Sequence, residues 1–257
     1  MADSVQDARP YVDARSVYLS FGRVQALKDI SFGVQRGTIF GLVGSDGAGK
    51  SSVLRLVAGM IRPSAGKIFI GSLDSVTGRR KIKRLIGYMP QRFGLYPDLT
   101  VGENMDFFMD IFGIVRAERK RRKEKYLGFS NLLPFLDRQA GNLSGGMKQK
   151  LGLACVLVHE PELLILDEPT NGVDPVSRRE FWDMLGQMRS EGMTIVVATA
   201  YLDEAKKCDR LALMHAGNLL EQNEPARMQG DYPSLETAVV DRIRQVDKGL
   251  ADDSFEY

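Results

Sequence analysis

A short glycine-rich stretch constrains the fold of this chain more than any other feature. Residues 44–51 read Gly-Ser-Asp-Gly-Ala-Gly-Lys-Ser and match the pattern G-x-x-x-x-G-K-[ST]. The apolar run at residues 39–43 predicts a buried strand before the motif, and the segment that starts at Ser52 predicts a helix after it. The motif therefore lies in the strand–loop–helix setting that it requires.

The residue types of this loop suit the phosphates of a nucleoside triphosphate. Glycines let the backbone turn tightly and direct successive N–H groups toward an anion. Lys50 is expected to reach the β- and γ-phosphates, and the Ser51 hydroxyl is expected to bind Mg²⁺. The residues predicted to contact the nucleotide in this loop are Gly44, Ser45, Asp46, Gly47, Ala48, Gly49, Lys50, Ser51 and Ser52. The alternative is a glycine-rich turn that carries Lys-Ser by chance.

Two carboxylates end a second apolar run. Residues 163–166 are aliphatic and predict a buried strand, and Asp167 and Glu168 follow directly. Such a strand delivers its charges to the carboxyl edge of the sheet, where α/β proteins bind ligands. We expect Asp167 to hold Mg²⁺ and Glu168 to act as general base toward the attacking water. Two solvated carboxylates at a strand end are the alternative.

Composition limits the class of protein. The chain has 257 residues, of which 44% are hydrophobic and 26% charged, and its net charge of +2 gives no argument for nucleic-acid binding. Cys155 and Cys208 lack metal-ligand spacing, which fits a reducing compartment without a disulfide framework. The polar N-terminus is unlike a secretory signal, and no apolar run reaches the ~18–20 residues that span a bilayer. Another subunit would have to supply any membrane contact.

The order of predicted elements indicates the α/β class. Strands and helices alternate before residue 91 and after residue 159, which predicts a P-loop NTPase core with a mostly parallel sheet and an antiparallel β part near the N-terminus. Residues 92–158 carry helix-spaced apolar side chains and predict an inserted helical subdomain. The predicted parts are residues 1–91, 92–158, 159–230 and a tail at 231–257. In addition, residues 1–10 read as a loose lead-in, and the tail as a helix at 235–246 with a flexible end.

Residues 143–149, Leu-Ser-Gly-Gly-Met-Lys-Gln, decide between families of phosphate-loop enzymes. Ser144 or Asn142 is expected to cap a helix that runs to about residue 159, which makes an anion site at a helix N-terminus. Together with the two nucleotide motifs, this stretch resembles the signature motif of the ATP-binding cassette (ABC) ATPases over residues 12–230. In that family the motif closes on ATP bound by the opposite subunit. The resemblance implies that Ser144, Gly145 and Gly146 act in trans.

The same resemblance assigns roles to single residues. Phe21 matches the aromatic that stacks on adenine, with a core phenylalanine as the alternative. Gln91 matches the glutamine that touches Mg²⁺ and moves with the helical subdomain. Asp174 matches the aspartate that links two subunits, although an aspartate in a turn before proline would read the same way. The implied catalytic set is Glu168, Lys50 and Gln91, and the implied metal ligands are Ser51, Gln91 and Asp167.

Two positions depart from the family pattern. The family places a histidine that senses the γ-phosphate after the strand at residues 194–199, where this chain has Ala200. An alanine methyl donates neither a hydrogen bond nor a proton, so we expect ATP binding to survive and hydrolysis to be weakened or partner-dependent. Ser45-Asp46 replaces the common Pro-Asn, and the charge of Asp46 lowers phosphate affinity unless it faces away.

The resemblance implies an ATPase subunit of an exporter that lies on the cytoplasmic face of the cell membrane. Residues 91–101 are similar to ATPases of drug and polysaccharide efflux. The expected ligands are ATP and Mg²⁺, and the expected partners are transmembrane permease subunits and a second cassette, without nucleic acid. The basic run at residues 116–125 reads as a solvated helix face or as a weak lipid contact.

Three other readings stay open from the sequence. Ala200 favours a regulatory cassette that binds ATP while a second cassette hydrolyses it, whereas the intact set of Lys50, Asp167 and Glu168 argues against this. A second alternative is an ABC ATPase that acts on ribosomes or DNA. The chain could also be one cassette of a tandem protein.

Overall fold

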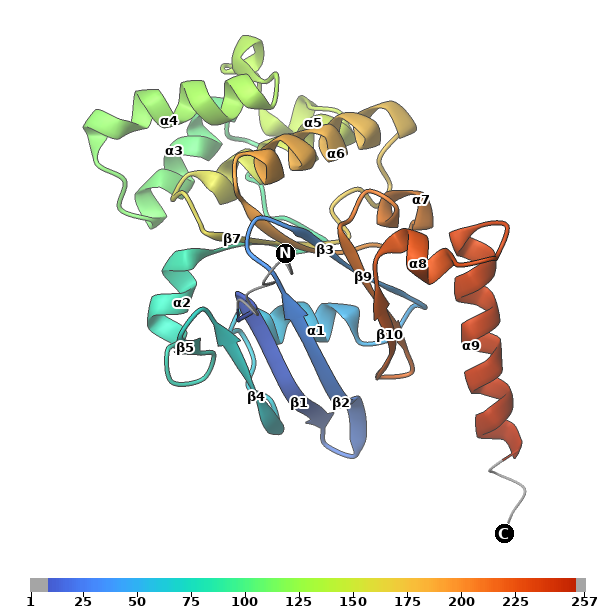
Figure 1. Cartoon of the computed structure of the whole chain (residues 1–257). Helices are drawn as coiled ribbons and strands as arrows, with labels where there is room; N and C mark the ends of the chain where they lie inside the picture. Colours follow the sequence, from blue (N-terminus) through green and yellow to red (C-terminus); the bar gives the residue numbers. More distant parts are fainter. Residues whose placement is uncertain (1–8, 253–257) are drawn as a thin grey trace, which may run out of the picture.

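The computed structural model of the chain describes residues 9–252, with side chains up to residue 247. Most of the predicted lead-in at residues 1–10, and the end of the tail after residue 252, lie outside this part. Figure 1 shows two sheets with helices around them and a group of helices at one end of the molecule. Within the described part, no helix has both the length and the apolar character that crossing a membrane requires.

The larger sheet forms the centre of the molecule. Its strand order is β10-β9-β3-β8-β7-β6, and β10 is the antiparallel edge strand of an otherwise parallel sheet. The strands are β3 (Ile39–Gly44), β6 (Ile86–Met89), β7 (Leu163–Asp167), β8 (Thr194–Ala198), β9 (Arg210–His215) and β10 (Asn218–Asn223). Every residue of β7 and β8 is buried, as expected of parallel strands covered on both faces.

The second sheet is antiparallel, as predicted for the N-terminal part. Its order is β2-β1-β4-β5, and its strands are β1 (Val12–Phe21), β2 (Val24–Val34), β4 (Ala65–Ile70) and β5 (Leu73–Asp74). Helix α1 (Lys50–Val57) contacts strands of both sheets and therefore lies between them. Its buried side chains are Lys50, Val53, Leu54, Leu56 and Val57.

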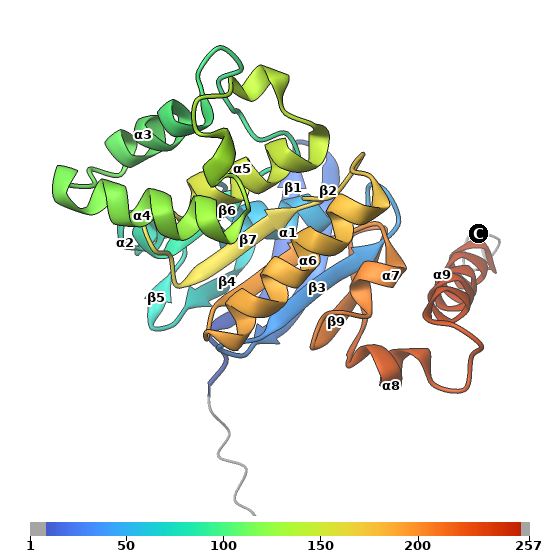
Figure 2. The same ribbon diagram turned by 90° about the horizontal axis from the view of Figure 1, so that it is seen from above.

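Alternation along β3 divides the core in two. Phe40 and Leu42 face a cluster that contains α1 and the antiparallel sheet, whereas Ile39 and Val43 face a cluster that contains the helices on the opposite side. On that side lie α5 (Gly145–Leu157) and α6 (Pro175–Ser190), and Figure 2 shows α6 running across the central sheet. The smaller helices of the core are α2 (Arg79–Leu85), α7 (Leu202–Ala205) and α8 (Pro225–Gln229).

The helical part follows β6. It comprises α3 (Val101–Ile111), α4 (Arg116–Phe129), the 3₁₀ turns Leu133–Phe135 and Ala140–Asn142, and then α5. Thr100 and Glu103 form a capping box that fixes the start of α3, and Met105 and Met109 on this helix are fully buried. The last element is α9 (Leu235–Asp252), which extends further than the predicted helix. It lies beyond β10 at the opposite end of the molecule (Figures 1 and 2).

Candidate nucleotide-binding site

The loop between β3 and α1 has the backbone that its glycines predict. Gly44, Gly47 and Gly49 adopt φ values of 145°, 74° and 103°, a region that other residues rarely enter. At Gly44 a side chain would also overlap the backbone of Met214 on β9, so the loop and that strand lie in close contact. Helix α1 begins at Lys50, and the free N–H groups of such a helix start are suited to bind an anion.

Lys50 lies folded against its own loop. Its ammonium donates hydrogen bonds to the carbonyl oxygens of Gly44 at 2.9 Å and Ser45 at 3.0 Å, and the residue is only 5% exposed. A buried ammonium needs such acceptors, because an unpaired charge is costly to bury. A phosphate anion is a stronger acceptor than a carbonyl, so these two contacts can be exchanged for phosphate oxygens.

Ser51 and Asp167 meet although 116 positions separate them in the chain. Ser51 Oγ donates to Asp167 Oδ1 at 2.8 Å, and Tyr88 Oη donates to Asp167 Oδ2 at 3.4 Å. Asp167 ends β7 and is 3% exposed. Burial, together with the nearby negative charge of Asp167, raises the pKa of Tyr88, so its phenol stays a hydrogen-bond donor at neutral pH. The structure thus brings the two predicted metal ligands of the loop and the strand together.

This pair of oxygens suits a magnesium ion. Mg²⁺ prefers oxygen ligands and is usually held by one or two protein groups together with substrate phosphates. A serine hydroxyl and a carboxylate beside a phosphate loop match that chemistry. Among the described residues, no group of three or more His, Cys, Asp or Glu side chains could form a metal site from protein ligands alone.

Glu168 lies at the edge of a small cavity next to the loop. The cavity has a volume of about 180 Å³ and is lined by Asp46, Gly47, Ala48, Gly49, Lys50, Ser51, Ser52 and Glu168. The Glu168 carboxylate accepts hydrogen bonds from Gln91 Nε2 at 2.8 Å and from Asn171 Nδ2 at 3.2 Å. Its backbone is left-handed, with φ of 49°, which is uncommon for a glutamate and often marks a functional site.

The signature stretch begins a helix, as predicted. Ser144 is the N-cap of α5 and accepts a hydrogen bond from the Met147 N–H, which decides between the two predicted caps. Gly146 packs so closely on Ser177 of α6 that a side chain there would overlap it. None of residues 144–146 appears among the described residues that line the phosphate-loop cavity, so within one chain the structure does not join the two motifs.

Two further predicted residues lie at the surface. Phe21 ends β1 and is 55% exposed, which rules out the alternative of a core phenylalanine. Asp174 is the N-cap of α6 and accepts from the N–H groups of Val176 and Ser177, at 3.1 and 2.9 Å. These bonds lower the pKa of Asp174, so its carboxylate stays charged. The roles of Phe21 in stacking and of Asp174 between subunits stay predictions.

The side chains on either side of Ala200 make contacts of their own. Ala200 is exposed and follows β8, while the Thr199 hydroxyl donates to the buried carboxylate of Glu204. The Tyr201 ring lies 4.0 Å below the guanidinium carbon of Arg178, turned toward α6. Neither of these partners, Glu204 and Arg178, is among the described residues that line the cavity.

The two histidines lie in different parts of the structure. His159 stacks on Phe112 at 3.9 Å, and burial lowers its pKa. His215 contacts Ser45 of the phosphate loop through its Nδ1 at 2.9 Å. The sequence does not predict this contact, because the two residues are 170 positions apart. Tyr88 and Asn171 are likewise missed, although the position of Asn171 three residues after Glu168 is a usable signal.

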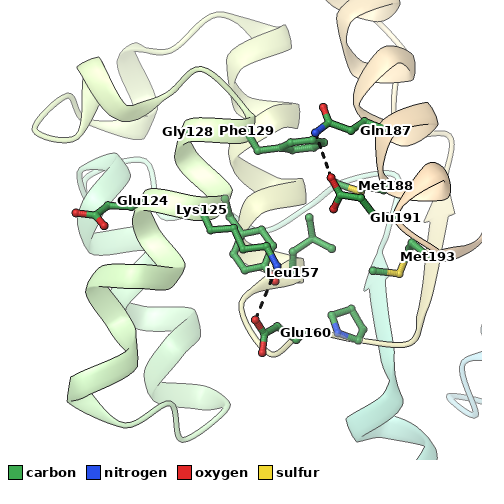
Figure 3. A pocket seen from close by; sticks show the side chains of 12 residues that line it. Glu124, Lys125, Gly128, Phe129, Leu157, Glu160, Gln187, Met188, Glu191 and Met193 are labelled. Carbon is green, nitrogen blue, oxygen red and sulfur yellow. Dashed lines mark hydrogen bonds and ion pairs between the residues drawn. The ribbon is translucent and has the colours of Figure 1, made fainter.

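A larger cavity lies away from these residues. It has a volume of about 580 Å³ and opens between α4, the end of α5 and α6 (Figure 3). Tyr126, Phe129, Leu157, Met188 and Met193 line it, with charged side chains at its edge. The smaller cavity is the better nucleotide site, because it presents the N–H groups of a helix N-terminus, an ammonium and a carboxylate, whereas the larger one offers mainly apolar atoms.

Comparison with known proteins places this geometry in a family. The family model described as "ABC transporter" matches residues 27–171. The chain belongs to the ABC transporter family. It is 48% identical over 192 residues to YbhF of Escherichia coli, described as a probable multidrug ABC transporter ATP-binding protein. That match covers 75% of this chain but only 33% of YbhF, so the chain spans about a third of the length of this relative.

Other relatives are closer to this chain in length. The linearmycin resistance ATP-binding protein LnrL of Bacillus subtilis is 34% identical over 210 residues, which cover 81% of this chain and 68% of LnrL. Among solved structures, cbiO1 from Clostridium perfringens has a TM-score of 0.81 at 27% identity, over 95% of this chain and 99% of that one. A bacterial ABC transporter cassette bound to ADP and Pi in a dimer has a TM-score of 0.74 at 25% identity, over 83% and 98% of the two chains. The predicted family and the predicted α/β fold are confirmed.

Proposed function

We propose that this chain is the ATP-hydrolysing subunit of an exporter whose membrane-spanning part lies in other subunits or domains. The observation that carries the proposal is the meeting of the phosphate loop, Asp167 and Glu168 at the carboxyl edge of the central sheet. This edge is where α/β proteins bind nucleotides. The names of the relatives, among them multidrug, linearmycin resistance and Nod factor export proteins, support export as the direction.

The phosphates bind in the small cavity. The N–H groups at the start of α1 and the Lys50 ammonium surround the β- and γ-phosphates, and Lys50 exchanges its two carbonyl contacts for phosphate oxygens. Phe21, exposed at the end of β1, offers one face of its ring to the adenine. Asp46 lines the same cavity, so its negative charge lowers phosphate affinity unless a cation lies nearby.

Ser51 and Asp167 are the proposed magnesium ligands, and Gln91 is the third. Magnesium at this site would neutralise negative charge on the β- and γ-phosphates. The Ser51–Asp167 hydrogen bond holds both oxygens in place before binding. Tyr88 contributes by fixing the second oxygen of Asp167.

Glu168 is the proposed general base. Its carboxylate lines the cavity beside the loop and can accept a proton from the water that attacks the γ-phosphate. Gln91 and Asn171 bind one carboxylate oxygen and so orient the group. Ala200 supplies no hydrogen bond to the γ-phosphate, which is why we expect slow hydrolysis or help from a partner.

A second cassette completes the site. Ser144, Gly145 and Gly146 begin α5 and do not line the cavity of their own chain, so we propose that they contact ATP bound to the opposite subunit. Because the γ-phosphate then touches both subunits, ATP favours the closed pair and hydrolysis releases it. Asp174 is the proposed link between the two subunits.

The closing motion passes to the membrane partner through the segment after Gln91. A cavity of about 390 Å³ lies there, lined by Gln91, Arg92, Phe93, Leu95, Pro97, Ala140, Lys148 and Gln149. These residues come from the segment after β6 and from the turn and helix that carry the signature, so the cavity joins the core to the helical part. A cytoplasmic segment of a permease that fills this cavity would contact both parts, so changes at the nucleotide site and movement of the helical part would both displace it.

Steady-state ATP hydrolysis tests the proposal. Wild type is compared with Glu168→Gln, Lys50→Ala and Ala200→His, and MgATP binding is measured on each by calorimetry. We expect Glu168→Gln to lower kcat by about 10²–10⁴-fold while MgATP still binds. Lys50→Ala should lose binding.

Ala200→His separates hydrolysis by this chain from the regulatory alternative. If wild type turns over ATP and Ala200→His only speeds it up, the chain is a working ATPase. If wild type binds ATP without turnover and Ala200→His restores hydrolysis, Ala200 is the cause of the lost activity and a second cassette hydrolyses the ATP. If wild type did not bind MgATP, both the ATPase proposal and the regulatory alternative would be wrong.

A further inference from the structure

The turn between β9 and β10 lies directly against the phosphate loop. Gly44 is paired with Met214 at the end of β9, and the Gly217 N–H donates to the Ala48 carbonyl at 3.2 Å. On its other side the turn meets β2, where a side chain at Gly217 would come within 2.7 Å of the Ala26 carbonyl oxygen. The turn has little freedom, so a side chain on it can hold a residue of the loop in place.

His215 is the last residue of β9 and directly precedes this turn. Its Nδ1 lies 2.9 Å from Ser45 Oγ and its Nε2 lies 2.8 Å from Asp247 Oδ1, and its side chain is 14% exposed. A carboxylate only accepts hydrogen bonds, so Nε2 carries the hydrogen. In the neutral ring Nδ1 then accepts from the Ser45 hydroxyl, and in the charged ring it donates to it. Either form joins Ser45 to Asp247 through one imidazole.

Asp247 belongs to α9, and α9 is packed on the same end of the molecule. Leu235 and Ala238 at its start are fully buried, and Arg242 pairs with Glu221 of β10 at 2.5 Å. Figures 1 and 2 show α9 beyond β10, on the far side from α3 and α4. The contact of Asp247 with His215 is therefore a second fixed point on this helix, roughly one and a half turns beyond Arg242.

We propose that His215 is a positioning residue for the phosphate loop and that Asp247 makes its action depend on the docking of α9. Ser45 provides one of the two carbonyl oxygens that hold Lys50 Nζ. A fixed Ser45 therefore fixes the position of that carbonyl and the shape of the loop before the nucleotide arrives. Preorganisation of this kind raises affinity, because less order has to be created on binding. The proposal rests on the nucleotide site proposed above.

Four substitutions test the chain of contacts from Ser45 through His215 to Asp247, which we call the relay. An asparagine amide can take the place of Nδ1, and a glutamine amide that of Nε2. His215→Asn therefore keeps the contact with Ser45, whereas His215→Gln keeps only the contact with Asp247. Asp247→Ala removes the link to α9. Glu236→Gln is the matched control, since it removes a carboxylate from an exposed position of the same helix.

The measurements are the Kd of MgATP by calorimetry and the KM and kcat of hydrolysis, on the full chain. We expect His215→Gln to raise Kd and KM about five-fold and Asp247→Ala about three-fold, with kcat within about two-fold. His215→Asn should restore most of the affinity, and Glu236→Gln should match wild type. A role in folding alone would lower the melting temperature and spare Kd.

Two outcomes would overturn the relay. One is a His215→Gln chain that binds MgATP as tightly as wild type, and the other is a His215→Asn chain that binds no better than His215→Gln. In both cases wild type still binds MgATP and Lys50→Ala still loses it, so the proposed nucleotide site survives. If wild type itself does not bind, the proposed function fails first.

A spectroscopic reading supports or contradicts the same link. The chain has two histidines, and His159 is recognised by its stacking on Phe112. We expect the imidazole ¹⁵N signals of His215 to move both in Asp247→Ala and when MgATP is added to wild type. If the ¹⁵N signals of His215 did not respond to MgATP, they would contradict a contact between His215 and the nucleotide-binding phosphate loop.

Discussion

At the scale of single residues, Gly146 sets the spacing between α5 and α6. A methyl group in its place would overlap the side chain of Ser177, whereas one at Gly145 would meet nothing within 4 Å. We expect Gly146→Ala to lower the free energy of unfolding by about 1–3 kcal/mol, because two packed helices must separate. Gly145→Ala should stay within about 0.5 kcal/mol of wild type. Thermal unfolding of both variants measures this, and equal melting temperatures would contradict it.

Asp174 shows how one carboxylate can serve its own helix whatever it does between subunits. Hydrogen bonds from Ser177 and Val176 lower its pKa from the ordinary 3.8. A lowered pKa in the folded state stabilises the fold above pH 3.8, and this contribution is lost as the pH falls through the lowered pKa. Asp174→Asn keeps an acceptor oxygen but not the charge. We therefore expect wild type to have a higher melting temperature than Asp174→Asn at neutral pH.

The test of Asp174 is a pair of melting curves across pH. The difference in melting temperature between wild type and Asp174→Asn should shrink once the pH drops below 4. A difference that stays constant down to pH 2 would show that the charge of Asp174 does not act through the cap.

The chemistry of single residues was partly predictable from sequence. Ser51 and Asp167 each belong to a motif that predicts a metal ligand near the carboxyl end of a strand. Because parallel strands end at the same edge of a sheet, their proximity could be predicted. The contact of His215 with Ser45 does not follow. It requires β9 to lie next to β3, and nothing in residues 210–215 states which strand will be its neighbour. Strand order is a property of the whole sheet.

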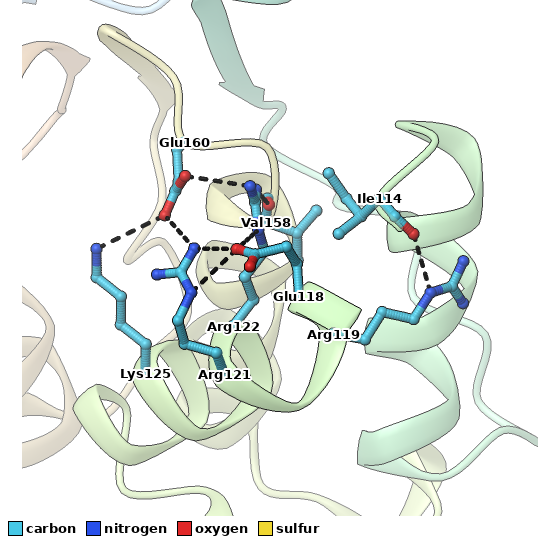
Figure 4. A network of polar contacts seen from close by, with 8 residues as sticks. All are labelled: Ile114, Glu118, Arg119, Arg121, Arg122, Lys125, Val158 and Glu160. Carbon is cyan, nitrogen blue, oxygen red and sulfur yellow. Dashed lines mark hydrogen bonds and ion pairs between the residues drawn. The ribbon is translucent and has the colours of Figure 1, made fainter. Parts of the chain in front are cut away.

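At the scale of elements, α4 shows how a strongly basic run is accommodated. Arg119 and Lys123 pair with acids on α3. Other cations of the helix pair with Glu118 on α4 itself and with Glu160, as Figure 4 shows. Glu160 alone lies within 4.0 Å of Arg121, Arg122 and Lys125. The basic run thus has local partners, which favours the reading as a structural helix face over a lipid contact.

Glu160 should therefore matter more than an ordinary surface acid. We expect Glu160→Gln to lower the free energy of unfolding by about 1 kcal/mol, because three cations lose their shared partner. Glu124→Gln is the control, since among residues 9–247 Glu124 forms an ion pair only with the exposed Lys120, at 3.9 Å. This substitution should change stability by less than about 0.5 kcal/mol. Urea unfolding at low and high salt measures both. A Glu160 effect that equals the control, or that ignores salt, would contradict the prediction.

Elements with long apolar runs were predictable, and short polar helices were not. The buried strands β3, β7 and β8 are nearly continuous in aliphatic residues, which fits only a covered parallel sheet. Helix α2 was missed because five of its seven residues are charged and so show no helical period of apolar residues, and Ile82 is its one buried residue. Helix α8, with five residues, was missed for the same reason.

At the scale of the whole molecule, one chain holds only half of each proposed nucleotide site. The phosphate loop and Glu168 lie together, whereas the signature residues 144–146 begin a helix that does not line their cavity. Two copies, or this chain and a different cassette, must therefore meet for ATP to contact both motifs. One similar solved cassette, with a TM-score of 0.75 at 25% identity, is a dimer.

A variant that hydrolyses ATP slowly should allow the dimer to be detected in solution. We expect Glu168→Gln to elute as a dimer in size-exclusion chromatography with MgATP, because ATP persists at the interface, and as a monomer without nucleotide. Adding Ser144→Arg should leave ATP binding to the single chain but prevent the dimer, since a large side chain then occupies the position that the γ-phosphate needs. Glu168→Gln that stays monomeric at saturating MgATP would exclude a homodimer. Its natural partner would then have to be a second, different cassette, which is also the arrangement that Ala200 favours.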